Sequence, residues 1–167
     1  MAWPNSRLTT YTSASQIKAN DLNAIQDAII GAKHGSLTKV VPAIGAISST
    51  AGGVVSGASI FRTGASGGTC YRALDLDAGA RIVNIRVRLK DVAGSTCTAK
   101  LLSDVDGVQT TISTVGTSSG AGAYQTLTAS GINHTVATGK NYCVEFTFGG
   151  AAANADLHRI EIDYDQP

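Results

Sequence analysis

Few residues in this chain have types and spacing that could do covalent chemistry. Residues 64–68 read Gly-Ala-Ser-Gly-Gly, which matches the Gly-x-Ser-x-Gly form of a hydrolase nucleophile with Ser66 as the attacking group. That motif requires a helix directly after the serine, whereas residues 70–76 have the pattern of a strand. We therefore predict no catalytic residue and a protein that is not an enzyme. A small hydrolase on a β scaffold stays open as an alternative, and it would need a carboxylate pair or a Ser–His pair assembled by long-range folding.

The histidines and acidic residues do not have the spacing of a metal site. His34, His134 and His158 lie in three separate contexts, without a paired spacing and without a Cys-x-x-Cys motif. Residues 104–107, Asp-Val-Asp-Gly, resemble the start of a calcium-binding loop, but the ligands that would complete that loop are missing. We expect these four residues to form a hairpin turn, and we predict neither a metal nor another cofactor.

The three cysteines, Cys70, Cys97 and Cys143, are an odd number, so at least one of them lies outside an intrachain disulfide. Each lies in a strand-like segment, which predicts small buried thiols. A disulfide between two of them stays open, since it depends on the redox compartment.

The low charge of the chain argues against two classes of partner. The net charge is +1 and 15% of the residues are charged, so we do not expect a basic surface that follows a nucleic-acid backbone. No apolar run approaches the length of about 18 residues that crosses a bilayer, so we do not expect membrane insertion. The N-terminus lacks a charged segment followed by an apolar run, which leads us to expect synthesis in the cytoplasm without a secretory signal.

A ladder of three basic residues is the first candidate for surface recognition. Arg86, Arg88 and Lys90 alternate with apolar residues, so they lie on one face of a predicted strand. The ladder could bind an anionic glycan or the acidic surface of a partner. Alternatively, it could pair with carboxylates such as Glu161 and Asp163 on a neighbouring strand.

Tyr124 is the second candidate for surface recognition. It ends the segment 118–124, Ser-Ser-Gly-Ala-Gly-Ala-Tyr, which has the composition of a loop. Loops on a rigid β scaffold commonly carry binding residues, which makes Tyr124 a candidate contact for a ligand.

Strand patterns recur at short intervals after residue 57, and no helix pattern separates them. Antiparallel pairing is therefore expected, because parallel strands need long crossover connections. The predicted strands are 58–62, 70–76, 81–90, 96–103, 108–115, 124–128, 140–148 and 157–164. The predicted core residues are Val83, Ile85, Val87, Leu89, Val144, Phe146, Ile160 and Ile162. We predict a mostly β protein, in which a short N-terminal arm and helix precede an antiparallel jelly-roll-like β-sandwich.

One short amphipathic helix is predicted over residues 20–30. Its apolar seam, at 3-4-3 spacing, consists of Leu22, Ile25, Ile29 and Ala32. The seam could pack on the chain's own β domain, but we favour self-association or docking into a larger assembly, because a Gly/Ser-rich stretch follows. We predict that residues 1–40 are an arm and attachment or oligomerisation helix, that residues 41–57 are a linker or first strand, and that residues 58–167 are a displayed β-sandwich.

Residues 17–29, Ile-Lys-Ala-Asn-Asp-Leu-Asn-Ala-Ile-Gln-Asp-Ala-Ile, resemble a segment near the start of many bacteriophage tail-fibre, tail-spike and other virion appendage proteins. The β part, with its alternating pattern rich in Gly, Ser and Thr, is similar to the trimeric heads of phage fibres and to head-decoration domains. The resemblance implies a non-enzymatic structural protein of the virion, anchored through its N-terminal region. It further implies a homotrimer whose partners are other virion proteins and, at the display domain, a glycan or protein of the host surface. A free carbohydrate-binding, lectin-like module is the alternative from another class.

Overall fold

Alternating apolar and polar residues make most of the described chain β-strand. The computed structural model describes Ile25 and residues 36–48, 54–56, 60–63, 68–150 and 155–166. The chain divides into two compact units, Met1–Gly35 and Ser36–Pro167. In the second unit the strands are β1 (Ser36–Pro42), β2 (Ile47–Ser48), β3 (Val54–Ser56), β4 (Ile60–Thr63), β5 (Thr69–Leu74), β6 (Arg81–Asp91), β7 (Ser95–Val105), β8 (Val108–Thr117), β9 (Tyr124–Thr135), β10 (Asn141–Gly150) and β11 (Ala155–Asp165), with one 3-10 turn, η1 (Ala43–Gly45).

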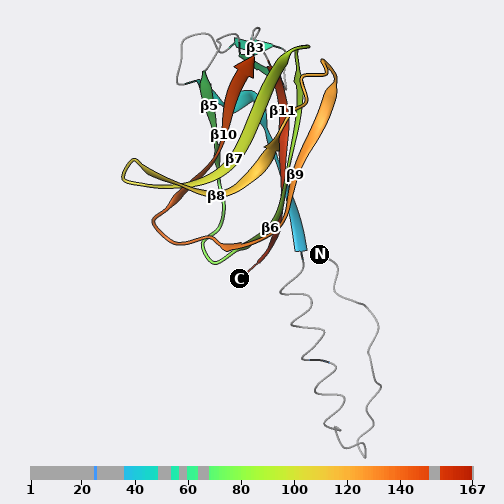
Figure 1. The fold of residues 1–167 in the computed structure, drawn as a ribbon. Coiled ribbons are helices and arrows are strands. Elements are labelled where there is room, and N and C mark those ends of the chain that lie inside the picture. The colour runs from blue at the N-terminus through green and yellow to red at the C-terminus, as the bar shows by residue number, and fades with distance from the viewer. Residues whose placement is uncertain are drawn as a thin grey trace, which may run out of the picture. The chain divides into compact units, whose positions relative to one another are not determined.

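These strands form two antiparallel sheets that pack face to face (Figure 1). The six-stranded sheet has the order β3-β4-β11-β6-β9, and β1 pairs with β11 as well. The five-stranded sheet has the order β2-β5-β10-β7-β8. From β5 onward the chain passes from one sheet to the other at every connection except the β7–β8 hairpin. The predicted jelly-roll-like antiparallel β-sandwich is confirmed. No helix among the described residues is both long and apolar enough to cross a membrane.

The sandwich begins at residue 36, upstream of residues 58–167, where the displayed domain was expected, and of residues 41–57, which were expected as a linker or first strand. Residues 36–42, which the sequence placed in the N-terminal arm and linker, form strand β1 along the C-terminal half of β11. The chain then turns through η1 into β2 of the other sheet. Arg72 holds this crossing, because its guanidinium donates to the carbonyl oxygens of Pro42, at 2.9 Å, and of Gly45, at 3.3 Å. The division into an attachment region and a displayed domain stays a prediction.

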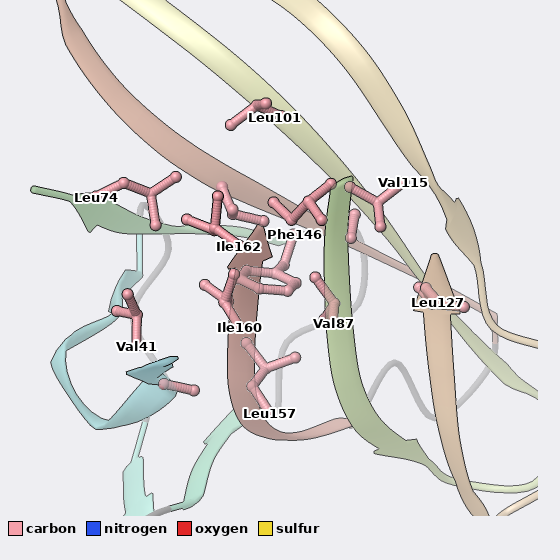
Figure 2. Close-up of a cluster of buried hydrophobic side chains, with 14 of the residues drawn as sticks. Val41, Leu74, Val87, Leu101, Val115, Leu127, Phe146, Leu157, Ile160 and Ile162 are labelled. Carbon is pink, nitrogen blue, oxygen red and sulfur yellow. The ribbon is translucent and has the colours of Figure 1, made fainter. Parts of the chain in front are cut away.

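The core lies between the two sheets, with the ring of Phe146 near its centre (Figure 2). Seven of the eight predicted core residues are buried: Ile85, Val87, Leu89, Val144, Phe146, Ile160 and Ile162. The exception is Val83, which is partly exposed, while Ile82 is fully buried in its place. In the pairing with β11, Val83 is the extra residue of a β-bulge, and in the pairing with β9 it lies opposite the unpaired residues 131–133. A bulge reverses the alternation of faces, and for that reason a strict period of two fails here.

A second bulge shapes the outer face of the same sheet. In β11 the pairing with β6 shifts between Leu157 and Arg159, and His158 is the residue that is skipped. The shift restores burial of Ile160 while both His158 and Arg159 remain outside the core. Bulges often re-aim a side chain, and this one keeps Arg159, which alternation continued from Leu157 would turn inward, on the outer face together with His158.

The predicted turn at residues 104–107 is confirmed as the β7–β8 hairpin. Asp106 and Gly107 both have positive φ, 52° and 83°, as a two-residue type I′ turn requires. A carboxylate oxygen of Asp104 accepts from the backbone N–H of Gly107 at 3.2 Å. The acidic side chains of this segment therefore serve a turn.

Candidate functional site

Several residues singled out in the sequence fall outside the described part of the chain. They are Leu22, Ile29 and Ala32 of the apolar seam, His34, and Ser66 of the Gly-x-Ser-x-Gly match. Ile25 is described as helical, and the residue is 38% exposed in the isolated chain. The role of the seam in attachment or self-association therefore stays a prediction.

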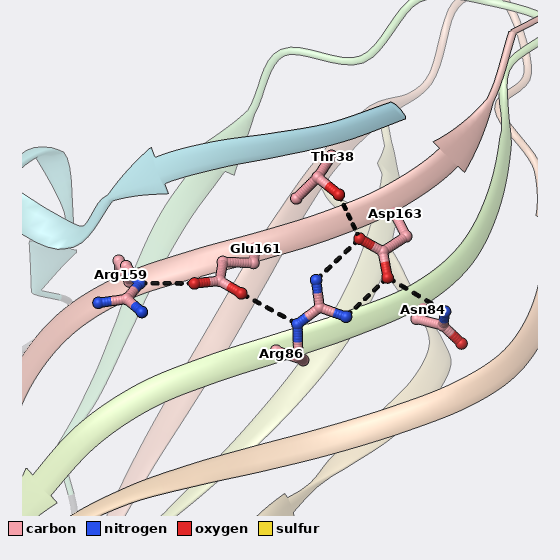
Figure 3. Close-up of polar contacts among 6 residues, drawn as sticks. All are labelled: Thr38, Asn84, Arg86, Arg159, Glu161 and Asp163. Carbon is pink, nitrogen blue, oxygen red and sulfur yellow. Dashed lines mark hydrogen bonds and ion pairs between the residues drawn. The ribbon is translucent and has the colours of Figure 1, made fainter. Parts of the chain in front are cut away.

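Arg86 belongs to an ion-pair network on the outer face of the six-stranded sheet (Figure 3). Its Nη1 and Nη2 donate to the two oxygens of Asp163 at 2.6 and 2.8 Å, and its Nε donates to Glu161 at 2.9 Å. Arg159 binds the other oxygen of Glu161 at 2.6 Å, and the hydroxyl of Thr38 donates to Asp163 at 2.7 Å. The basic ladder was expected either to bind an anionic ligand or partner or to pair with carboxylates on a neighbouring strand. Arg86 pairs with carboxylates.

The network holds its groups in their charged forms. Hydrogen bonds from Arg86 are the main reason that the pKa of Asp163 lies well below its usual range. Bonds from Arg159 and then Arg86 lower the pKa of Glu161, and the bonds to Asp163 and Glu161 raise that of Arg86. Because the network spans β1, β6 and β11, it ties the first strand of the sandwich to its last.

The other two members of the ladder face an aromatic ring. Lys90 pairs with Tyr124 across β6 and β9, and Arg88 lies one position further along the same face. Cζ of Arg88 is 5.3 Å from the ring centroid of Tyr124, and Nζ of Lys90 is 5.8 Å from it. Tyr124 is still 48% exposed. The fold thus brings together two candidates from distant parts of the sequence, Arg88 and Tyr124, and adds Lys90 to them.

His158 completes this group, which we call the Tyr124 cluster: Tyr124, Arg88, Lys90 and His158. The imidazole of His158 meets the tyrosine ring edge to face, with centroids 6.2 Å apart and an interplanar angle of 75°. Its Nδ1 is buried without a hydrogen-bond partner. His158 lies at the bulge in β11, on the face of the sheet that carries Tyr124.

A buried carboxylate fixes the loop that leads into Tyr124. Asp91, 1% exposed, ends β6 and accepts from the backbone N–H groups of Gly120, at 2.7 Å, and Gly122, at 2.9 Å. The side chain of Gln125 donates to the same carboxylate at 3.0 Å. The carbonyl of the Gln125 side chain in turn accepts from the backbone N–H of Ser119 at 3.0 Å. Tyr124 is therefore the first residue of β9, directly after a loop that is anchored by bonds on both sides of the tyrosine.

The charge of Asp91 is stabilised by these donors. Burial by itself raises the pKa of Asp91. Hydrogen bonds from Ser118, Gly120, Gly122 and Gln125 lower the pKa by more than burial raises it, so the pKa lies below its ordinary value. A carboxylate that accepts several backbone N–H bonds behaves in this way. No pattern of residue types in the sequence indicated this role. The signal that could have been used is a strand-ending aspartate together with a Gly/Ser-rich loop elsewhere in the chain.

Glycine is required at the tip of this loop. Gly120 has φ +72° and Gly122 has φ +70°, both in the left-handed region. A Cβ at Gly120 would lie 2.9 Å from the carbonyl oxygen of Ser95, the first residue of β7. The backbone N–H of Gly94 donates to the carbonyl of Gly120 at 3.0 Å, so the β6–β7 and β8–β9 connections are bonded to each other.

The described histidines and cysteines do not combine into a reactive pair. His134 contacts the hydroxyl of Tyr142 at 3.2 Å. The three cysteines are free thiols, with Cys70 and Cys97 buried and Cys143 partly buried. Burial raises the pKa of Cys70 to about 12, which suppresses its nucleophilic thiolate. Within the described residues no group of three or more His, Cys, Asp or Glu side chains could hold a metal ion.

No protein-family model matches the sequence, and no curated protein matches it. Solved structures with a similar fold include a carbohydrate-binding module, CBM36, in complex with calcium and xylotriose, with a TM-score of 0.51 and 16% identity over 74% of this chain and 98% of that one. The CBM36-1 domain of a multidomain xylanase from the hindgut metagenome of Trinervitermes trinervoides has a TM-score of 0.51 and 13% identity, over 75% and 96% of the two chains. A low-affinity xylan-binding module, CBM86, from Roseburia intestinalis has a TM-score of 0.50 and 12% identity, over 77% and 96%.

At these identities the likeness shows the fold alone. The calcium in the first of these complexes is a property of that module and is not carried over to this chain.

Proposed function

We propose that the β-sandwich is a non-catalytic carbohydrate-binding domain and that the Tyr124 cluster is its contact surface. The observation that carries the proposal is an exposed tyrosine, held by an anchored loop, on a sandwich whose fold resembles that of several carbohydrate-binding modules. The apolar face of a sugar ring can pack on an aromatic ring, while its hydroxyl groups bond to polar side chains around it. Tyrosine suits this role because it offers apolar area and a polar tip.

The rigidity of the site supports binding. The bonds of Asp91 and Gln125 to the 118–123 loop order the backbone before a ligand arrives. Binding then requires less loss of conformational entropy, which improves affinity without further contacts. The neighbours Arg88 and Lys90 also hold the ring through cation–π contacts, each worth roughly 0.5–1 kcal/mol at an exposed site.

The N-terminal segment supplies attachment in this proposal. The resemblance of residues 17–29 to virion appendage proteins supports an anchor on a phage particle, and the division of the chain at Gly35 is compatible with a separate anchor. Repetition of a weak sugar contact on a symmetric particle would give high avidity. A free lectin-like module remains the competing form, and it would bind the same sugars without an assembly.

Binding of the full chain to a panel of immobilised oligosaccharides tests the proposal. We expect retention on a subset of the panel and, for Tyr124→Ala, a loss of affinity of about ten-fold or more, which is the size of effect of a central aromatic contact. Val108→Ala is the matched control, because Val108 is an exposed apolar residue, 70% accessible, in the hairpin of the other sheet. Equal loss in both variants, or no retention on any sugar, would contradict the proposal.

A further inference from the structure

We infer that the sugar recognised at the Tyr124 cluster is acidic and carries a carboxylate or a sulfate group. This inference rests on the proposed function and specifies its ligand class. It is argued from the difference between two sets of cations on the outer face of the six-stranded sheet.

The first set is neutralised by carboxylates of the same chain. Arg86 lies between Glu161 and Asp163, at 2.9 and 2.6 Å, and Arg159 binds Glu161 at 2.6 Å. Two arginines therefore face two carboxylates, and this part of the sheet carries no net charge. A ligand that replaced these bonds would have to compete with charge-assisted hydrogen bonds of short length.

The second set keeps its charge. Arg88 and Lys90 form no ion pair within the described residues, and their shared contact is the ring of Tyr124. One carboxylate, Asp156, lies opposite Lys90 in the register of β11 and β6, and it has an interaction of its own. The carboxylate of Asp91 is buried and bonded to the loop. Among the described residues the outer face at the cluster thus carries two cations against one carboxylate, so this face has a net positive charge.

The geometry fits an anion that is attached to a ring. The tyrosine offers the platform for the sugar, and the guanidinium of Arg88 and the ammonium of Lys90 lie within 6 Å of the ring centroid. A guanidinium can bind a carboxylate or a sulfate through two parallel hydrogen bonds, which a hydroxyl group cannot accept. Cations already held against the ring lose little freedom on binding. An acidic group placed at the edge of the sugar would therefore reach both cations while the sugar stacks.

Calorimetric titration of the full chain with three trisaccharides tests the inference. The probes are α-1,4-linked galacturonic acid, its neutral galactose counterpart, and the galactose trisaccharide carrying sulfate esters. We expect the galacturonate, the sulfated probe or both to bind about ten-fold tighter than the neutral one, as two charge-assisted contacts predict. The two acidic probes separate carboxylate from sulfate recognition. Raising the salt concentration should weaken only the acidic ligands.

The variants are Arg88→Gln and Lys90→Gln, with Lys140→Gln as the matched control, because Lys140 is an exposed cation beyond the opposite end of β9. We expect each of the first two to lose about three-fold or more in affinity for the acidic sugar, with neutral binding unchanged, and the control to keep full affinity. If the neutral probe binds as tightly as the acidic ones in a Tyr124-dependent manner, the inference fails and the proposed function stands. If none of the three probes binds, the inference fails, and absence of binding across the wider sugar panel then rejects the proposed function as well. Equal binding of polyglutamate, unaffected by Tyr124→Ala, would show general attraction of polyanions and overturn the inference.

Discussion

Replacement of Asp91 by asparagine tests whether this one carboxylate holds the loop that presents Tyr124. Oδ2 of Asp91 accepts from Gly120 and Gln125, at 2.7 and 3.0 Å, and Oδ1 accepts from Gly122 at 2.9 Å. Asparagine has nearly the same shape but a single acceptor oxygen. If that oxygen takes the place of Oδ2, the new amide group points its own hydrogens at the backbone N–H of Gly122.

The expected cost follows from these three bonds. One charge-assisted bond is lost, the partly buried N–H of Gly122 is left without an acceptor, and the two remaining bonds become neutral. A hydrogen bond to a charged group contributes about 1.5–3 kcal/mol, and an unsatisfied buried donor costs about 1–3 kcal/mol. We expect Asp91→Asn to lower the free energy of unfolding by about 3 kcal/mol. The melting temperature should fall by on the order of 10 °C.

Urea unfolding followed by circular dichroism measures this loss. Asp106→Asn is the matched control: it makes the same chemical change at an exposed residue whose φ of 52° asparagine readily adopts. We expect the control to stay within about 0.5 kcal/mol of the wild type. Hydrogen exchange of the Gly120 and Gly122 amides should accelerate in Asp91→Asn, and affinity for the sugar should decrease. An Asp91→Asn protein as stable as the control, with both amides still protected, would refute the reasoning.

Three further predictions concern the ion-pair network, the core and the thiols. Because the pKa of Asp163 is lower in the folded chain than its unfolded value of about 3.9, its contribution to stability is complete above that value and is lost as pH falls through the folded pKa. Melting temperatures from about pH 5 to about pH 2 should therefore fall less steeply for Asp163→Asn than for the wild type, and parallel curves would contradict this. Phe146→Ala should cost about 3–5 kcal/mol in urea unfolding, and a loss below about 1 kcal/mol would mean that the ring is not a centre of the core. In the folded protein at about pH 8, Cys70 and Cys97 should resist alkylation, because burial raises the pKa of both thiols. Mass spectrometry after treatment with iodoacetamide checks this, and rapid modification of either residue before unfolding would show that they are accessible.

The sequence by itself determined the strands from residue 58 onward and most of the core, but not the first strand, β1. Alternation of apolar and polar residues is a local pattern with a period of two, and it settled which face of β10 and of most of β6 is buried. The pair Asp106 and Gly107 likewise specified a hairpin, because positive φ at both positions is a local requirement. The absence of a helix pattern between strands then implied antiparallel pairing and a sandwich.

Tertiary structure decided where the alternation breaks and which charges meet. The extra residues Val83 and His158 are recognisable only from the register with neighbouring strands, because a bulge is a relation between two strands. Pairing of β1 with β11 likewise depends on a partner more than a hundred positions along the chain.

In the candidate site, too, the sequence determined some features and the tertiary structure decided others. Its sequence candidates Arg86, Arg88 and Tyr124 could be named from residue types, but only the register of β6 with β9 and β11 assigned Arg86 to carboxylates and Arg88 to the tyrosine ring. Asp91 was not recognisable, because its function depends on backbone N–H groups of a loop about thirty positions away. Hydrogen bonds and ion pairs act over a few ångströms in space, whereas the sequence orders residues along the chain. Local periodicity therefore predicts elements and their faces, and the neutralisation or exposure of a particular charge follows from the fold.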